Sequence, residues 1–170
     1  MALKHPKQAA SNESPAIATM SADALLDGLG RLLEFLFEEE ANYLCGAPLH
    51  MRSHKRVNYR IGYYARKFRT RLGSIPLRIP HLLHIHPRVP IVKRARRLNA
   101  GILESLAGIH AAGATTESAA ALIKMLWTVE LPGELLAVLA KKLVAVLNKW
   151  RDEMPGAGVS AAGPDGGARA

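Results

Sequence analysis

One long segment of the chain concentrates the side chains that could bind an anionic ligand. Between Ala41 and Leu103 there is no Asp or Glu, while these 63 residues hold 14 of the 23 Lys and Arg residues and five of the seven His. The whole chain has a formal charge of +9, so the residues outside this segment net −5. Clustered cations are typical of surfaces that bind nucleic acid, whereas a surface that serves only solubility usually intersperses both signs. We therefore favour phosphate binding over the alternative of a solvated basic surface.

A metal site made of imidazoles is a second candidate chemistry. The histidines of the segment are His50, His54, His81, His84 and His86. Zinc sites usually add cysteines or carboxylates to histidine, and here acids are absent and Cys45 is the one cysteine. We expect no metal and no cofactor in this chain, and a buried apolar role for Cys45.

Three tyrosines among the cations allow a third kind of contact. Tyr59, Tyr63 and Tyr64 could stack on exposed bases, as aromatic side chains do in proteins that bind single strands. The alternative, which we favour, is that they pack against the apolar side of the element that carries them.

The cations need an element that places them on one surface, and alternation around Gly73 predicts a β-hairpin. Tyr64 to Arg71 alternates, Leu72-Gly73 is a turn signal, and Ser74 to Ile79 alternates again. One face would collect Tyr64, Phe68, Ile75, Leu77 and Ile79, and the other Lys67, Arg69, Arg71 and Arg78. Pro76 predicts an edge strand because it lacks an N–H. His81 to Pro90 is predicted to be a loop.

Four segments with helical spacing supply the remaining scaffold. Ser21 is the expected N-cap of a helix to about Tyr43, whose acidic run 38–40 could dock against the basic segment. A second amphipathic helix is predicted from about Ile91 and closed by Gly113, with its apolar period at Ile91, Ala95, Leu98, Ile102, Leu106 and Ile109. Thr115 would cap a short helix with Ala119, Leu122, Ile123 and Leu126 inward. The last helix would run from Glu134 to Arg151 and bury Leu135, Val138, Leu139, Leu143, Val146, Leu147 and Trp150.

These elements predict a mainly α-helical fold with one small β-hairpin and disordered termini. Residues 1–20 are predicted as a disordered tail and 154–170 as a low-complexity tail. Residues 21–90 would hold the N-terminal helix and the basic hairpin, and 91–153 a helix-turn-helix-like region, or else a plain three-helix packing unit. No apolar run reaches the roughly 18 residues of a membrane helix, and no signal peptide is evident. We expect no membrane partner and a cytoplasmic, nucleoid-associated location.

Several short motifs occur in a fixed order. They are Asn58-Tyr59-Arg60-Ile61-Gly62-Tyr63-Tyr64, Thr70-Arg71-Leu72-Gly73 with Leu77 and Pro80, Gly113-Ala114-Thr115-Thr116, Val129-Glu130-Leu131, and Trp150. They are similar to the segments R-N-G-Y-Y, T-R-x-G-x-x-x-L-x-x-P-R, G-V-S-T and V-E-x-S, and to a tryptophan before a catalytic domain. By their order and spacing, the region from about Leu32 to Glu153 resembles the N-terminal region of Mutator-type bacterial insertion-sequence transposases.

Three departures from that pattern bear on DNA contact. His81 and Glu117 stand where the family usually has arginine, and Pro132 and Ala137 stand where it typically has serines. Hydroxyls contact phosphates and base edges, whereas proline and alanine side chains cannot. The last helix then offers few polar side chains for reading bases: Glu134, Lys141, Lys142, Asn148 and Lys149.

The resemblance also implies where strand chemistry would reside. In the family, two aspartates and a glutamate hold two metal ions, Mg²⁺ in the intact enzyme, downstream of the tryptophan matched by Trp150. Only 20 residues follow Trp150, and Asp152, Glu153 and Asp165 lie in or beside the low-complexity tail. We expect no catalytic centre in this chain, which would be a truncated or decayed copy or one part of a split gene whose partner encodes the catalytic domain.

The resemblance and the charge pattern together predict binding of duplex DNA at the terminal inverted repeats of a transposable element. We expect the following residues to contact DNA: Arg52, Lys55, Arg56, Arg60, Arg66, Lys67, Arg69, Arg71, Arg78, Lys93, Arg94, Arg96, Arg97, Thr115, Thr116, Lys141 and Lys142. Two alternatives remain open, a structural or homodimerisation module built on the last helix, and an RNA-binding adaptor, because charge alone does not separate DNA from RNA.

Overall fold

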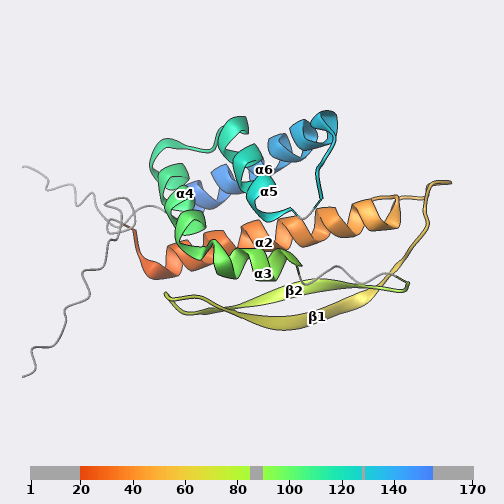
Figure 1. Cartoon of the computed structure of the whole chain (residues 1–170), viewed down its shortest axis with the longest axis horizontal. Helices are drawn as coiled ribbons and strands as arrows, with labels where there is room; N and C mark the ends of the chain where they lie inside the picture. Colours follow the sequence, from red (N-terminus) through yellow and green to blue (C-terminus); the bar gives the residue numbers. More distant parts are fainter. Residues whose placement is uncertain (1–19, 85–89, 128, 155–170) are drawn as a thin grey trace, which may run out of the picture.

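The computed structural model describes residues 20–84, 90–127 and 129–154, and this part of the chain forms five α-helices and one antiparallel hairpin (Figure 1). The helices are α2 (Ala22–Cys45), α3 (Pro90–Arg97), α4 (Asn99–Ala112), α5 (Thr116–Leu126) and α6 (Gly133–Glu153), and the strands are β1 (Arg60–Arg69) and β2 (Ser74–Leu82). The predicted mainly α-helical fold with one small hairpin is confirmed. Apart from Met20 and Met154, the two predicted tails lie outside the described residues. None of the described helices has the length and apolar character needed to span a bilayer.

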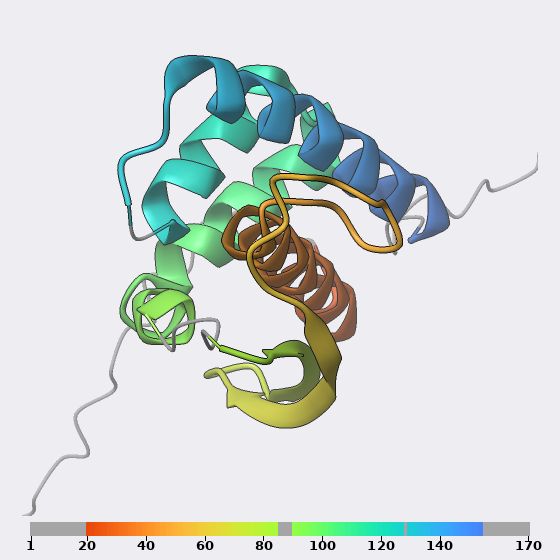
Figure 2. The same ribbon diagram turned by 90° about the vertical axis from the view of Figure 1, so that its right-hand side faces the viewer.

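Helix α2 lies between the hairpin on one side and the helices α4 to α6 on the other (Figures 1 and 2). Ser21 caps it as predicted, because the Ser21 hydroxyl oxygen accepts the N–H of Ala24 at 3.2 Å. The helix ends at Gly46, whose φ of 67° lies in the left-handed region that favours glycine. A side chain at Gly46 would also collide with the Lys55 carbonyl. Cys45, in the last turn, is fully buried as predicted.

Gly28 allows α6 to approach α2 closely. A Cβ added at Gly28 would lie 2.5 Å from Cζ2 of Trp150, which is fully buried. The glycine that helical propensity disfavours in mid-helix therefore makes room for the largest side chain of the core.

The hairpin presents one apolar face to α2. Directly opposed residues of antiparallel strands share a face, and Phe68 is opposite Ile75, Arg66 opposite Leu77 and Tyr64 opposite Ile79. Four side chains of this face are buried in the main core: Phe68, Ile75, Leu77 and Ile79. The predicted apolar face is therefore confirmed, except that Tyr64 remains 40% exposed.

The strands differ in extent from the prediction. Strand β1 begins at Arg60 instead of Tyr64, and β2 continues to Leu82, because Gly62 pairs with His81 and Arg60 with Leu82 beyond a register irregularity. The predicted start of a loop at His81 is therefore wrong, and residues 85–89 of that loop, His86 included, lie outside the described residues.

The predicted continuous helix from Ile91 to Gly113 is wrong, because it breaks at Leu98 into α3 and α4, but Gly113 does end the second half as predicted. The backbone hydrogen bonds continue on both sides, from the Leu98 N–H to the Arg94 carbonyl and from the Ile102 N–H to the Leu98 carbonyl. Helix α3 packs against α5, whereas α4 packs mainly against α2. The two halves bury their apolar sides against different partners, and Leu98, at the bend, is exposed.

Helices α5 and α6 complete the core. Thr115 forms a capping box with Ser118 at the start of α5, and the four side chains predicted to face inward from α5 are buried. In α6, the predicted burial is confirmed for Leu139, Leu143, Leu147 and Trp150 but is wrong for Val138, which is 52% exposed. One continuous core joins α2, the hairpin and the helices α3 to α6.

Candidate nucleic-acid interface

The outer face and the tip of the hairpin carry cations into solvent. Lys67 lies opposite Pro76 and Arg69 opposite Ser74, on the face away from the core, and both side chains are exposed. The tip is held by Thr70, whose hydroxyl oxygen accepts the N–H groups of Leu72 and Gly73 at 3.1 Å each. Arg71 is therefore part of the turn, not of a strand face as predicted, and its side chain is exposed.

Arg78 lies in a more acidic environment than the other hairpin cations. Its guanidinium carbon lies 4.6 Å from the ring centre of Tyr63, and its backbone N–H donates to Glu34 at 3.2 Å. Burial, followed by a hydrogen bond with Glu38, raises the pKa of Tyr63. Arg66 lies opposite Leu77 on the helix-facing side and is half-buried. Arg66 is therefore less exposed than Lys67 or Arg69, whereas Arg78 is exposed but has its guanidinium over the Tyr63 ring.

Helix α3 adds a second group of exposed cations. It lies on the same side of α2 as the hairpin (Figures 1 and 2). Lys93, Arg96 and Arg97 are exposed, whereas Arg94 turns inward and donates to the carbonyl of Trp127. Arg94 therefore ties α3 to the end of α5, and the other three cations face solvent.

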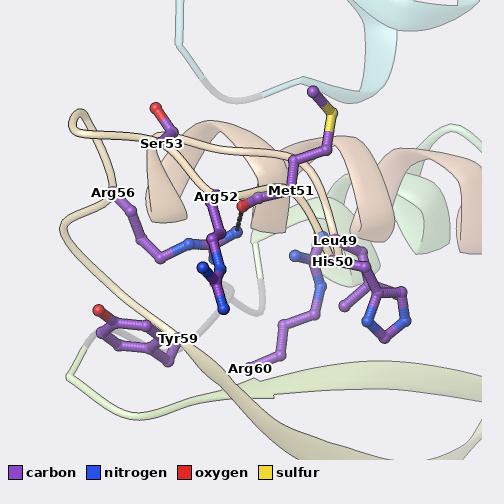
Figure 3. A pocket seen from close by; sticks show the side chains of 8 residues that line it. All are labelled: Leu49, His50, Met51, Arg52, Ser53, Arg56, Tyr59 and Arg60. Atoms are coloured by element: carbon purple, nitrogen blue, oxygen red, sulfur yellow. Dashed lines mark hydrogen bonds between the residues drawn. The ribbon is translucent and has the colours of Figure 1, made fainter.

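Residues 46–59, between α2 and β1, enclose a hollow lined by three arginines (Figure 3). Its volume is about 370 Å³, and it is lined by Leu49, His50, Met51, Arg52, Ser53, Arg56, Tyr59 and Arg60. Arg56 holds the loop together, because its Nη2 donates to the carbonyls of Pro48 at 2.9 Å and Met51 at 2.6 Å. Among the described residues, no carboxylate lines this hollow.

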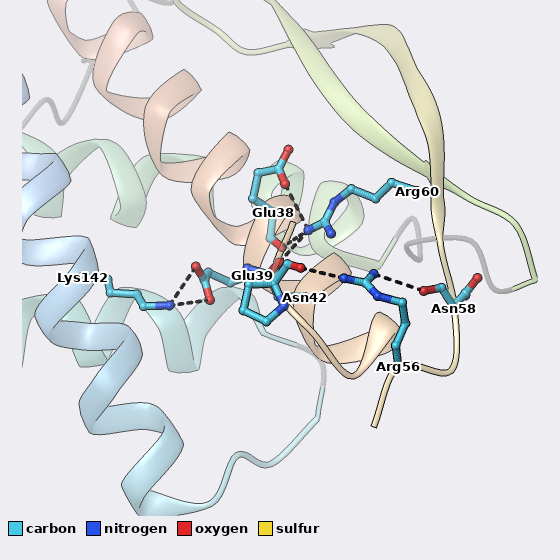
Figure 4. Close-up of polar contacts among 8 residues, drawn as sticks. Glu38, Glu39, Asn42, Arg56, Asn58, Arg60 and Lys142 are labelled. Carbon is cyan, nitrogen blue, oxygen red and sulfur yellow. Dashed lines mark hydrogen bonds and ion pairs between the residues drawn. The ribbon is translucent and has the colours of Figure 1, made fainter. Parts of the chain in front are cut away.

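Arg60 and the acidic run at the end of α2 form a polar network with α6 (Figure 4). The Arg60 side chain is only 4% exposed, and its Nη2 lies 3.2 Å from Glu38 Oε2 and 2.7 Å from Asn42 Oδ1. Glu39 pairs instead with Lys142 of α6 at 3.2 Å. The expected docking of the acidic run against the basic segment is therefore seen for Glu38, whereas Glu39 ties α2 to α6.

Of the residues in α5 and α6 that are predicted to contact DNA, some are bonded to other groups of the protein and others are exposed. Thr115 serves as the cap of α5, while Thr116 beside it is exposed. Lys142 is paired with Glu39, while Lys141 is exposed. Asn148 accepts the N–H of Ala114 at 2.9 Å, which holds the turn between α4 and α5.

Apart from Arg66, which is half-buried, and Arg78, which lies over the Tyr63 ring, the predicted cations fall into two sets. Arg56, Arg60, Arg94 and Lys142 bond to carbonyls or carboxylates of the protein. A second set, which we call the free cations, is exposed with no side-chain hydrogen bond, ion pair or ring contact to any described residue. The free cations are Arg52, Lys55, Lys67, Arg69, Arg71, Lys93, Arg96, Arg97 and Lys141.

The three tyrosines of the basic segment differ from their predicted placement. The expected packing of the tyrosines against the apolar side is wrong, because all three are exposed: Tyr59 beside Arg56, Tyr63 beside Arg78 and Tyr64 edge-on to His81.

Within the described ranges, no three His, Cys, Asp or Glu are placed to hold a metal ion. The Mg²⁺ that the family resemblance implies therefore fits no site in this part of the chain.

Comparison with known proteins identifies the family. The model described as "Transposase, Mutator family" matches residues 1–157, so the chain belongs to the Mutator family of transposases. It is similar to the transposase for insertion sequence element IS1081 of Mycobacterium tuberculosis, with 29% identity over 137 residues, 79% of this chain and 33% of that protein. It is 23% identical over 119 residues to the transposase for insertion sequence element IS256 in transposon Tn4001 of Staphylococcus aureus, covering 70% of this chain and 30% of that protein.

A third relative is the transposase for insertion sequence element ISRM5 of Rhizobium meliloti, with 26% identity over 137 residues, 81% of this chain and 32% of that protein. The chain thus spans about a third of the length of the curated relatives it matches. No solved structure matches it significantly.

Several residues of the sequence motifs hold the scaffold in place. Buried Asn58 accepts the N–H groups of Tyr59 at 2.9 Å and His84 at 3.1 Å, which fixes the loop to the end of β2. Thr70 closes the hairpin turn, and Trp150 packs on Gly28. Sequence reasoning missed the role of Asn58 and the hollow beside it, because both depend on contacts between distant segments.

Proposed function

We propose that this chain binds duplex DNA at the terminal inverted repeats of a transposable element and so takes part in DNA transposition. The observation that carries the proposal is the set of free cations on the hairpin, on α3 and in residues 46–59, in a chain of the Mutator transposase family. Lysine and arginine that neutralise phosphates release counterions and supply affinity that does not depend on base sequence. The family membership supports DNA as the polyanion.

The proposal assigns different tasks to the two parts of the scaffold. The free cations of the hairpin and α3 hold phosphates. The helix-turn-helix-like part, α4 to α6, orients the protein and has little capacity to read bases. On α6, Lys142 is paired with Glu39, Asn148 holds the α4–α5 turn, and Lys149 lies 3.7 Å from Glu153. Weak base readout therefore accompanies strong phosphate binding.

A competition experiment tests both halves of this proposal. Fluorescence anisotropy of a labelled duplex carrying the element's own terminal repeat is followed against unlabelled repeat, scrambled duplex and duplex RNA. We expect tight binding at low salt and a preference for the repeat over scrambled DNA of less than about a hundredfold, below the usual range of specific binders. The matched variants are Arg69→Ala and Arg71→Ala, which should weaken binding to every sequence alike.

Each alternative function predicts a different result. Failure to bind duplex DNA at low salt, together with a concentration-dependent dimer in light scattering, would favour the homodimerisation module. Tighter binding of RNA than of DNA would favour the RNA-binding adaptor. A repeat preference of many thousandfold would mean that a strong base-reading surface exists outside the residues assigned here.

A further inference from the structure

We propose that the hollow enclosed by residues 46–59 holds one unpaired nucleotide, with its phosphate among the three arginines and its base against Tyr59. The inference deepens the proposed function and rests on it, because it concerns the same nucleic-acid surface. It adds a ligand class, a nucleotide freed from the double helix, which the free cations of the hairpin do not require.

The charge of the hollow is the first observation. Figure 3 shows the side chains of Arg52, Arg56 and Arg60 converging on it, and no carboxylate from the described part of the chain lines it. Arg60 is paired with Glu38 outside the lining, but Arg56 is bonded only to carbonyls, which leave its charge uncompensated, and Arg52 has no such bond to any described residue. Like charges held close together are unfavourable, and one phosphate between them would offset that cost.

The buried arginine is the second, independent observation. The Arg60 side chain is 96% buried, and its Nε and Nη1 have no hydrogen-bond partner among the described residues. Buried donors without partners are rare in folded proteins and costly to maintain. His50, which also lines the hollow, has a φ of 61°, an uncommon conformation for a residue other than glycine. The unusual backbone of His50 and the unsatisfied donors of Arg60 therefore belong to two residues that line the same hollow.

Tyr59 supplies the surface for a base. Its side chain is 55% exposed, and its ring centre lies 5.5 Å from the guanidinium carbon of Arg56. Its backbone is fixed on both sides, by Asn58 Oδ1 at 2.9 Å and by the N–H of Leu83 at 2.9 Å. The ring is therefore held at the rim of the hollow by contacts that do not involve the side chain.

The size of the hollow favours a single nucleotide over a duplex. A volume of about 370 Å³ lies at the lower end of the roughly 300–1,000 Å³ found for small-ligand pockets. A duplex keeps its bases stacked inside and offers phosphates along its outside, so it can use the free cations but not the stacking surface of Tyr59. An unpaired nucleotide at a frayed or single-stranded end can use both.

The test compares two probes with the full chain, a labelled single-stranded oligothymidine and a labelled blunt duplex. Tyr59→Ala should lower the affinity for the single strand at least about fivefold, the lower end of what one base–aromatic stack contributes, and leave the affinity for the duplex unchanged. Tyr59→Phe keeps the ring and should bind like wild type. Tyr43→Ala is the matched control, because Tyr43 is 57% exposed but lies outside this hollow.

The outcomes separate this inference from the proposed function. Equal losses on both probes for Tyr59→Ala, or duplex binding by a wild type that ignores the single strand, would overturn the inference and leave duplex binding intact. Failure of the wild type to bind either probe would overturn both proposals. Because the backbone contacts of Tyr59 do not need its ring, circular dichroism should show the fold of Tyr59→Ala to be unchanged.

Discussion

Two glycines of α2 provide a matched pair of substitutions for testing the packing of the helices. Helical propensity alone predicts that Gly28→Ala and Gly30→Ala each stabilise the protein by about 1 kcal/mol. The structure predicts a gain in stability only for Gly30→Ala. At Gly28 the new Cβ would lie 2.5 and 2.6 Å from two ring atoms of buried Trp150, whereas at Gly30 the nearest atom outside the adjoining helix backbone, Cδ1 of Ile75, lies at 3.9 Å.

Overpacking of a filled core costs about 1–3 kcal/mol, so the balance at Gly28 ranges from neutral to a loss of about 2 kcal/mol after the propensity gain is subtracted. Gly30→Ala should gain about 0.5–1 kcal/mol. Urea titration followed by far-ultraviolet circular dichroism measures both against wild type, with unchanged m values as the check that only stability has changed. If Gly28→Ala proves as stable as Gly30→Ala, the close approach of α2 to Trp150 is wrong.

Three further predictions concern turns and pH. Gly46→Ala should destabilise the fold by more than about 1 kcal/mol in the same titration, because a left-handed φ is costly for alanine and the Lys55 carbonyl blocks the Cβ. Thr115→Ala should cost about 0.5–2 kcal/mol by removing the cap of α5, and Thr115→Ser should restore it. A hydrogen bond from Arg31 lowers the pKa of Glu153, so its stabilising contribution is present above the pKa of the unfolded carboxyl and is lost as pH falls through the folded pKa. Glu153→Gln should therefore reduce the acid-side change of the unfolding midpoint, and an unchanged profile would contradict that ion pair.

Local signals in the sequence were sufficient to predict most of the helices. Ser21 and Thr115 cap the helices that they were expected to cap, and the leucine spacing gives the buried face of α2. The break at Leu98 could not be predicted, since the apolar period continues through it and only the different packing partners of α3 and α4 bend the segment. The need for a glycine at position 28 could likewise not be predicted, because it arises from contact with Trp150, which lies far away in the sequence.

The candidate site shows the same division between local and distant information. The acid-free segment correctly located cations that the hairpin exposes, such as Lys67 and Arg69. It could not show that Arg60 is buried, because its partner Glu38 is 22 residues away, on α2. Nor could it show that Arg56 bonds to carbonyls, since those groups are brought together only when residues 46–59 fold.

The most direct test of the central claim is the salt dependence of duplex binding by wild type and by a variant that combines Lys67→Gln, Arg69→Gln and Arg71→Gln. If about six phosphates are engaged, log K for the wild type should fall against log salt with a slope near −5. The triple variant should lose about one unit of slope for each lost contact, which leaves a slope of about −2 to −3. A flat response of the wild type, or an unchanged slope for the variant, would contradict the claim that the hairpin cations bind DNA phosphates.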